Sequence, residues 1–543
     1  MKNKKTENVL SENYHFLGIE FGSTRIKAVL INEDHHVIAQ GNHDWENQMV
    51  NDIWTYSLEA VVQGLQDCYR QLKRDYQTQY GNCLTHLDGI GISAMMHGYL
   101  VFDAQGTLLT PFRTWRNTMT QQASEKLSDL FQFHIPQRWS IAHLYQAVLN
   151  KEEHVKDIAL QTTLAGYVHY LLTGKNVLGI GEASGMFPID TLTKSYDAHM
   201  LELVDEAVKK CGYPWKLCEI LPEVLQAGED AGQLSETGAK LLDPEGDLKA
   251  GVMLCPPEGD AGTGMVATNS IKPRSGNVSA GTSVFAMVVL EESLKNMYEE
   301  IDVVTTPEGN PVAMVHCNNG TSELNAWMSL FQELLQLAGN DMNMNDLYSL
   351  LFSKALQGDL SGSGLMACNY LSGEHITGFE EGLPLFVRSA DSSFTLANFM
   401  LTQLYSSLAT LKIGMDILIQ QEHVQLDQMY GHGGFFKTPI VGQKIMSAAM
   451  HAPVSVMTTA GEGGAWGSAV LASYRVNKNA YISLFDYLER NVFAQTQNCT
   501  IRADVDLQEG FDQFITNYKK ALFVERAAVD HLGAGCRTKQ QEG

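Results

Sequence analysis

The chain has 543 residues, of which 44% are hydrophobic and 18% are charged, and its formal net charge is −24. This length and composition predict about two to four packed domains rather than a disordered acidic tail. The negative charge argues against non-specific nucleic-acid binding, because a polyanion repels a surface without a basic stripe.

The sequence also predicts a soluble, cytoplasmic protein without a membrane contact. The polar segment 1–12 is followed by no apolar stretch of signal-peptide length, and no window of 18 apolar residues occurs. The nine cysteines are scattered and never form a Cys-x-x-Cys pair. They indicate neither a disulfide framework nor a zinc site.

The first predicted element is a strand, a glycine turn and a second strand over 16–32, with the turn at 22–24. Helical periodicity follows over 53–76 and 120–131, and a short buried strand is predicted over 87–95. A second strand–turn–strand passage covers 276–290, about half the chain further on. Its recurrence suggests two related domains that face one another.

Later segments complete an α/β pattern. Helices are predicted over 396–419 and 324–337, and the glycine-rich turn 461–467 opens another helix over 468–474. Alternating strands and helices favour sheets covered by helices. A Pro/Ser stretch at 271–275 marks the boundary. We therefore expect domains at 13–272 and 273–532, with a disordered N-terminal tail at 1–12 and a fraying C-terminal tail at 533–543.

The turn after Glu20 has the chemistry of a phosphate site. Gly22 lets successive backbone N–H groups approach an anion, and the hydroxyls of Ser23 and Thr24 add donors. Glu20 would point to the same mouth and hold a hydrated Mg²⁺, which takes one or two protein carboxylates. An ordinary hairpin with a surface Glu is the alternative.

The turn Gly281-Thr282-Ser283 follows the same logic, and together the two turns would hold a polyphosphate from two sides. The segment 431–438 has glycines and a Lys-Thr pair, but Phe436 occupies the position where a P-loop needs glycine. We expect instead a glycine turn before a helix that begins at Pro439, with a flat ring or an α-phosphate lying against Gly433 and Gly434.

Two further residues are candidates for chemistry on a hydroxyl substrate. Asp260 stands in a turn framed by proline and glycine just before the domain boundary, where a carboxylate would act as general base. A helix-capping Asp is the alternative. His97 follows the strand over 87–95, and the carboxyl ends of strands are where open α/β sheets place ligands. A buried, hydrogen-bonded histidine is the alternative there.

In these motifs the chain resembles the FGGY family of carbohydrate kinases, which share the fold of actin and the Hsp70 ATPase. The likeness covers 16–474 and rests on the hairpins at 18–24 and 279–283, the glycine segment with Lys437-Thr438-Pro439, and the segments 183–185, 370–374 and 461–467. It implies an α/β fold of two actin-like, ribonuclease H-like ATPase domains with an interdomain cleft. Within the family, the Met-His-Gly at 96–98 is similar to that of xylulose kinases.

The resemblance implies site residues by position. It implies Asp260 as catalytic base, Glu20 as metal ligand, and a sugar site at Met96, His97, Trp115, Asn117 and Asp260. The implied ATP-binding residues are Gly22, Ser23, Thr24, Lys27, Gly281, Thr282, Ser283, Gly433, Gly434, Phe435 and Lys437. The chain departs from the family where Glu20 replaces the usual Asp, Phe435 replaces a glycine and His143 replaces a customary Lys.

The implied reaction is phosphoryl transfer from ATP, with Mg²⁺, to a sugar hydroxyl that Asp260 deprotonates. A ketose is expected as substrate, with xylulose or a related pentulose favoured. Another polyol, a hexulose, a deoxy-sugar or gluconate stays open within the class. A non-catalytic sugar or nucleotide sensor on the same fold is the alternative from a different class, and the resemblance leaves a homodimer open.

Overall fold

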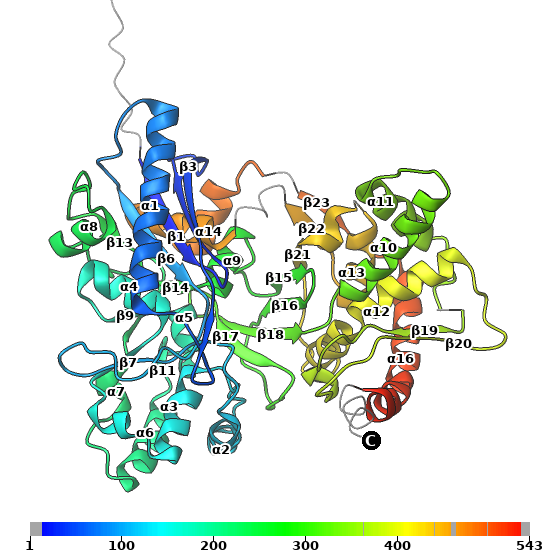
Figure 1. Cartoon of the computed structure of the whole chain (residues 1–543), viewed down its shortest axis with the longest axis horizontal. Helices are drawn as coiled ribbons and strands as arrows, with labels where there is room; N and C mark the ends of the chain where they lie inside the picture. The colour runs from blue at the N-terminus through cyan, green and yellow to red at the C-terminus, as the bar shows by residue number, and fades with distance from the viewer. Residues whose placement is uncertain (1–13, 362, 439, 458–462, 497, 534–543) are drawn as a thin grey trace, which may run out of the picture.

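The computed structural model describes residues 14–533 except 362, 439, 458–462 and 497. The tail expected at 1–12 and all but residue 533 of the tail expected at 533–543 therefore lie outside the described residues. Two large mixed sheets organise the rest, the first on the left and the second near the centre of Figure 1. We call the part built on the first sheet the first lobe and the part built on the second sheet the second lobe.

The first sheet forms around the predicted hairpin, in which β1 pairs antiparallel with β2 and parallel with β6. The strands in spatial order are β13 (Met253–Leu254), β6 (Gly89–Ala94), β1 (Phe16–Phe21), β2 (Arg25–Ile31) and β3 (Val37–Asp44), with β14 (Glu258–Gly259) also pairing with β6.

The second sheet repeats this pattern around the second predicted hairpin, since β15 pairs antiparallel with β16 and parallel with β21. Its strands in order are β17 (Asp302–Thr305), β18 (Pro311–Cys317), β16 (Val284–Val289), β15 (Ser275–Ala280), β21 (Gln428–His432), β22 (Val454–Met457) and β23 (Asn498–Ile501). The repeated strand order confirms the prediction of two related halves, which the recurring hairpin had suggested.

Helices cover both sheets and fill the ends of the lobes. Those of the first half of the chain are α1 (Leu58–Tyr80), α2 (Gln121–Phe131), α3 (Ser140–Asn150), α4 (Leu164–Thr173), α5 (Ile180–Ser184), α6 (Ala198–Lys210), α7 (Leu217–Ile220), α8 (Glu236–Leu242) and α9 (Asp260–Ala267). Those of the second half are α10 (Ser322–Leu337), α11 (Met344–Ala355), α12 (Leu396–Asp416), α13 (Val441–Met450), α14 (Gly463–Asn477), α15 (Leu484–Tyr487) and α16 (Val505–Leu532).

Small two-stranded sheets and short turns of helix complete the architecture. The strand pairs are β4 (Gln48–Val50) with β5 (Ile53–Thr55), β7 (Leu100–Phe102) with β8 (Leu160–Thr162), β9 (Val177–Gly179) with β12 (Glu223–Leu225), β10 (Ile189–Asp190) with β11 (Ser195–Tyr196), and β19 (Leu365–Cys368) with β20 (Leu385–Arg388). No helix in the described ranges is long and apolar enough to cross a bilayer.

Several predicted helices begin or end at other residues in the structure. The segment 53–76 was expected to be one helix, but Ile53–Thr55 is strand β5, paired with β4, and α1 begins only at Leu58. Ser57 sets that start, because its hydroxyl accepts the Ala60 N–H at 3.1 Å. The helix expected over 396–419 ends at Asp416 and continues as the π-helical turn Ile417–Gln421.

The helix expected from Pro439 begins at Val441, after a short 3₁₀ turn at Gly434–Lys437. Pro439 itself lies outside the described residues. The helix expected over 468–474 is α14, which already begins at Gly463. Residues 461 and 462 of the expected glycine turn also lie outside the described residues.

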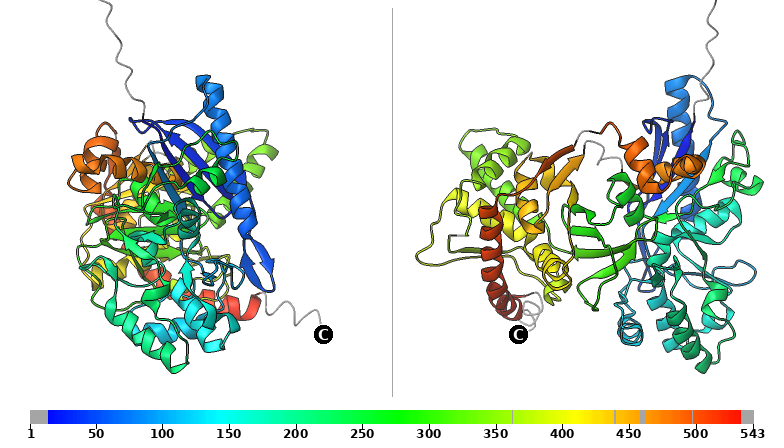
Figure 2. Two further views of the ribbon diagram at one scale, coloured as in Figure 1. Left: turned by 90° about the vertical axis from the view of Figure 1, so that its left-hand side faces the viewer. Right: turned by 180° about the vertical axis from the view of Figure 1, so that it is seen from behind.

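Helix α14 lies against the first sheet, although it follows β22 of the second sheet in the chain. It packs on β1, β6 and α9, and the view from behind shows it beside the blue strands (Figure 2). A Cβ on Gly18 or Gly91 would collide with backbone atoms of α14, so glycine at both positions permits this close approach. The helix thus carries residues 463–477 into the first lobe and against α9, whose first residue is Asp260.

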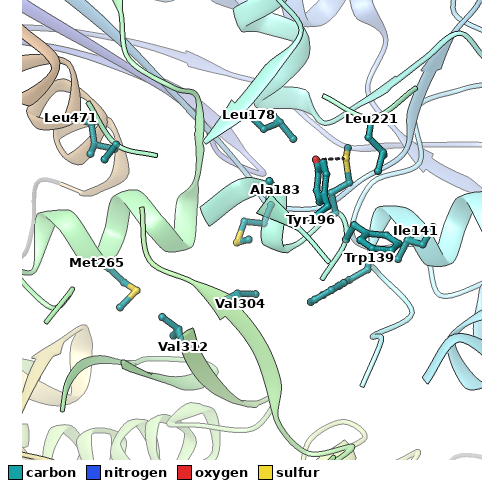
Figure 3. Packing of buried hydrophobic residues seen from close by; sticks show 14 of the residues in the cluster. Trp139, Ile141, Leu178, Ala183, Tyr196, Leu221, Met265, Val304, Val312 and Leu471 are labelled. Carbon is teal, nitrogen blue, oxygen red and sulfur yellow. Dashed lines mark hydrogen bonds between the residues drawn. The ribbon is translucent and has the colours of Figure 1, made fainter. Parts of the chain in front are cut away.

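The largest buried apolar cluster also crosses between the lobes. It joins Trp139 and Ala183 of the first lobe to Val304 and Val312 of the second, with Met265 of α9 beside them (Figure 3). Because a packed apolar contact excludes water and resists displacement, the two lobes meet along a defined junction at β17 and α5.

Candidate active site

Asp260 is the first residue of α9, and Gly259 is its N-cap. All hydrogen bonds described for its carboxylate go to Oδ1, which accepts the Ala261 N–H at 2.9 Å and the Met96 N–H at 3.3 Å. The second bond ties the carboxylate to the segment that precedes His97. Asp260 is therefore not the N-cap that the helix-capping alternative required, although its Oδ1 accepts the N–H of the next residue, and Oδ2 stays available to a substrate.

The surroundings of Asp260 suit a general base. Its side chain is open to solvent, yet the protein around it removes enough hydration to raise its pKa to about 6, and the nearby Glu20 charge adds to the effect. A carboxylate with a pKa near working pH accepts a proton from a hydroxyl more readily than an ordinary Asp.

Glu20 lies on β1 and reaches the beginning of α14. Its Oε2 accepts the Ala465 N–H at 3.1 Å, and its carboxylate lies against Gly464. A negative group is favoured there, because the first turn of a helix presents unpaired N–H groups. Burial raises the pKa of Glu20, while the Ala465 N–H and the charge of Lys27 oppose that rise. The structure thus brings Glu20, Lys27 and Asp260 to one place.

The first glycine turn is accessible and supported from behind. Gly22 and Ser23 are partly exposed and Thr24 is exposed. The Trp45 Nε1–H donates to the Gly22 carbonyl at 2.7 Å, and the Tyr56 hydroxyl donates to the Ser23 carbonyl at 2.6 Å. The Gly22 N–H donates to the Arg25 carbonyl at 3.0 Å within the turn, so the groups that the turn can offer to a ligand are those of Ser23 and Thr24.

In the second lobe the structure brings the other predicted phosphate turn next to the glycine segment. The parallel pairing of β15 with β21 sets Ser279 opposite His432, so both strands end side by side. Gly433 has φ 100° and lies so close to Ala280 that a Cβ would collide with its backbone. The turn at Gly281 is held by the Thr321 hydroxyl, which donates to the Gly281 carbonyl at 2.9 Å.

The members of this second set differ in exposure. Thr282, Gly433, Gly434 and Lys437 are exposed, which suits contact with a nucleotide. Phe435 was expected among the ATP-binding residues, but its side chain is buried in the second-lobe core, where its ring lies 6.1 Å from that of Phe352. The Phe435 side chain therefore does not reach a nucleotide, because it is packed in the core. Any contact with ATP at this point comes from the exposed backbone of Gly433 and Gly434.

His97 is buried and hydrogen-bonded at both ring nitrogens. Nδ1 lies 3.0 Å from the Gly185 carbonyl, and Nε2 lies 3.2 Å from Nε of Arg138. Burial lowers the pKa of His97 to about 3, and the Arg138 charge adds to the effect. The neighbouring Met96 packs against Gly259, so the 96–97 segment and Asp260 form one site.

Trp115 and Asn117 have different surroundings. The Asn117 side chain is buried and uses its amide on backbone, since Oδ1 accepts the Trp54 N–H and Nδ2 donates to the Trp54 and Thr114 carbonyls, each at 2.9 Å. Trp115 is 39% exposed, so its ring stays accessible. Asn117 therefore supports the β5 segment, and we leave it out of the proposed sugar site.

Two buried carboxyl groups beside Asp260 escaped prediction. Glu258 accepts the Glu182 N–H at 2.9 Å, and burial raises its pKa to about 8. Glu182 is fully buried against Gly259; burial raises its pKa, and the charges of Asp260 and Glu258 add to that rise. Glu258 stands two residues before Asp260, and that closeness in the chain was a sequence signal that it belongs to the site. Glu182 lies on α5, far from Asp260 in the chain, so no sequence signal linked it to Asp260.

His143, at the position of the family's customary Lys, is fully buried in α3 and stacks on Tyr99 with 6.2 Å between ring centroids. Burial lowers its pKa to about 3, and the Arg113 charge adds to the effect. It therefore carries no positive charge at neutral pH and does not replace the charge of a lysine.

A cavity of about 700 Å³ lies between the lobes, but none of the site residues predicted from the sequence lines it. Its walls include His134, Lys194, Tyr298 and Val304, and neither Asp260 nor a glycine turn lines it. The candidate site is therefore defined by Asp260 and the residues bonded to it, not by this cavity.

Comparison with known proteins identifies the class. The N-terminal domain of the FGGY family of carbohydrate kinases matches residues 15–245, and the C-terminal domain of the same family matches residues 276–476. The protein is an ATP-dependent carbohydrate kinase. It belongs to the FGGY family, as the motifs had indicated.

Relatives and solved structures agree with this placement. The xylulose kinase of Haemophilus influenzae is 22% identical over 530 residues, which are 92% of this chain and 99% of that protein. The ligand-bound xylulose kinase from Lactobacillus acidophilus has a TM-score of 0.76 at 15% identity, covering 96% of this chain and 99% of that chain. A gluconate kinase from Lactobacillus acidophilus gives the same values. The predicted fold of two actin-like α/β domains is confirmed.

Proposed function

We propose that the protein phosphorylates a ketose, with xylulose or a related pentulose favoured, and that Asp260 is the general base. The observation that carries the proposal is the Asp260 carboxylate, tied through Oδ1 to the Met96 N–H and with a pKa raised to about 6. The similarity to xylulose kinases over nearly the whole chain supports the choice of sugar.

The roles of the other groups follow from their positions. ATP phosphates would be held by the hydroxyls and the remaining N–H groups of the turns at 22–24 and 281–283, since the Gly22 and Gly281 N–H groups donate within their own turns. The adenosine end would rest near Gly433 and Gly434. The sugar would lie beside Met96 and His97. Asp260 Oδ2 would take the proton of the attacking hydroxyl as the γ-phosphoryl is transferred in line, a reaction that depends mainly on positioning.

The residues present fit a Mg²⁺ ion bound together with ATP. The Glu20 charge acts on Asp260, so two carboxylates lie close together, and one Glu20 oxygen accepts a helix N–H. Mg²⁺ needs only one or two protein carboxylates beside phosphate oxygens, and Glu20 and Asp260 would supply them. When bound, Mg²⁺ neutralises phosphate charge.

A screen of ADP release tests the function. Ketoses, polyols, deoxy-sugars and sugar acids are each added to the enzyme with ATP and Mg²⁺, and ADP is measured by a coupled assay. We expect a ketose to give the highest kcat/KM. A higher kcat/KM with gluconate or glycerol would assign the enzyme to one of the alternative substrates.

The Asp260→Asn variant tests the role of the base, with Asp103→Asn in a surface turn as the matched control. We expect Asp260→Asn to lose at least a hundredfold in kcat while its ATP affinity stays within about twofold of wild type. Substantial sugar-dependent ADP release by Asp260→Asn would refute the assignment.

A further inference from the structure

His97, which the family resemblance assigns to the sugar, has no free ring nitrogen. The Gly185 carbonyl can only accept, so Nδ1 carries the proton and donates to it at 3.0 Å. Nε2 is then an acceptor, and the Nε–H of Arg138 donates to it at 3.2 Å. The Trp139 ring stacks on the imidazole with 6.2 Å between centroids. His97 is therefore held as one neutral tautomer whose hydrogen-bonding capacity is used within the protein.

Arg138 is held at a second point by the other lobe. Its Nη2 group pairs with the Asp302 carboxylate on β17, which is only 7% exposed. His134 lies beside the other Asp302 oxygen, with its Nε2 at 3.5 Å. An arginine held by two acceptors in this way has a defined guanidinium plane, unlike a surface arginine with freely rotating bonds.

Strand β17, which carries Asp302, is fixed to α5 of the first lobe by hydrogen bonds. On the same strand, the Thr305 N–H donates to the Ser184 hydroxyl of α5 and the Thr305 hydroxyl donates to the Ile180 carbonyl, each at 3.0 Å. Trp139 and Val304, near neighbours of Arg138 and Asp302 in the chain, belong to one apolar cluster (Figure 3). The pair therefore belongs to the lobe junction.

The guanidinium still has capacity for a ligand. Arginine carries five N–H donors, and the two contacts above engage Nε and Nη2. The Arg138 side chain is 26% exposed, so a ligand can reach it. Arg138 does not line the 700 Å³ cavity described above, so that cavity is not its ligand site. Since Met96 and Asp260 adjoin His97, an arginine bonded to His97 lies at the edge of the proposed sugar site.

We infer that Arg138 is a specificity-determining residue that meets the sugar where His97 cannot, with His97 and Asp302 as its two supports. The inference rests on the proposed function for the location of the sugar. A guanidinium donates and never accepts, so it favours a substrate oxygen that only accepts: the carbonyl oxygen of a ketose or a carboxylate oxygen of a sugar acid. A polyol hydroxyl in the same place would gain less binding energy from Arg138 than a carbonyl or carboxylate oxygen does.

The charges around His97 agree with this arrangement. The groups that face it are Arg138, Asp302, His143 and the Gly185 carbonyl. Burial lowers the pKa of His97 to about 3, and Arg138 lowers it while Asp302 opposes the shift. The ring thus stays neutral at physiological pH and keeps its Nε2 lone pair for Arg138.

The test compares Arg138→Gln and Arg138→Lys with wild type, using xylulose, gluconate and xylitol as substrates. The matched control is Arg475→Gln, because Arg475 also pairs with an aspartate and is 22% exposed. For Arg138→Gln we expect KM for xylulose or gluconate to rise about ten- to a hundredfold, with kcat within about threefold of wild type. The preference over xylitol should be lost.

Asp302→Asn should raise the same KM by a smaller factor, because it loosens Arg138 from the other lobe. Arg475→Gln should change KM less than about twofold. An Arg138→Gln variant whose KM is unchanged, or rises equally for all three compounds, would overturn the inference, since a structural role alone does not discriminate among them. Unfolding midpoints and the KM for ATP show whether a variant is folded.

A wild-type enzyme that turns over none of these compounds would count against the proposed function but not decide this inference. Binding of the three compounds is then measured by calorimetry on wild type and Arg138→Gln. A wild-type preference for xylulose or gluconate over xylitol that the variant lacks supports the inference. Equal binding in both proteins, or no binding by wild type, overturns it.

Discussion

The pH dependence of kcat/KM tests the electrostatics of the site most directly. If Asp260 is the base, with a pKa of about 6, its ionised fraction is about 0.9 at pH 7 and about 0.1 at pH 5. The rate at low sugar concentration should therefore fall about tenfold over these two units. Because the acid form cannot accept a proton, the loss lies on the acid side.

The perturbation is Glu20→Gln, which keeps an acceptor for the Ala465 N–H and removes a negative charge beside Asp260. A like charge disfavours ionisation, so its removal should move the acid midpoint to lower pH, while the burial that contributes most to the shift remains. The matched control is Glu33→Gln, an exposed carboxylate on the first lobe.

The assay is coupled ADP release from pH 4.5 to 8 at subsaturating sugar, with the midpoint, not the amplitude, compared among the three proteins. This choice matters because Glu20→Gln is also expected to raise the Mg²⁺ requirement. Superimposed midpoints for wild type and Glu20→Gln, or a flat wild-type profile between pH 5 and 7, would refute the reasoning.

Three further predictions concern stability and are tested by urea unfolding. Gly91→Ala should cost about 1–3 kcal/mol, because its Cβ meets the backbone of Ser468, whereas Gly264→Ala has open space and serves as control. Lys73→Met should cost about 3–5 kcal/mol, because it leaves the 3%-exposed Asp243 carboxylate, 2.9 Å from the Lys73 ammonium, without a cation; a cost below about 1 kcal/mol would contradict this. Burial raises the pKa of Glu258 to about 8, so the folded state keeps a proton that the unfolded chain releases above about pH 4.5. The free energy of unfolding should fall by up to about 1.4 kcal/mol per unit between those values, and Glu258→Gln should reduce that slope; equal slopes would refute it.

The parts of the fold predicted from the sequence are those set by neighbouring residues. The two hairpins follow from apolar runs around a glycine turn, and the resulting strands pair within a few residues of each turn. The segment 53–55 misled the prediction, because its apolar residues continue the pattern of α1 while pairing with β4 decides its structure. The apolar pattern within 53–76 carries no information about β4, the strand with which 53–55 pairs.

The candidate site also has a part that short motifs indicate and a part that depends on residues far apart in the chain. Asp260, Glu20 and the glycine turns could be proposed as site residues from the sequence, because each carries its chemistry within a short motif. The contact between Glu20 and Ala465 spans 445 residues, and that between Arg138 and Asp302 spans 164. A residue pair so far apart leaves no periodicity or spacing in the chain. Only the folded arrangement, with α14 on the first sheet and β17 on α5, brings such pairs together.

The position of α14 has a consequence for how the protein is made. During synthesis the strands β1 and β6 emerge from the ribosome several hundred residues before α14, the helix that covers one of their faces through Gly18 and Gly91. Until then that apolar face stays open to solvent and to other chains, a state prone to aggregation. The first lobe therefore completes its folding only when residues 463–477 have been made, and a fragment that stops at 272 would lack the helix that covers its sheet.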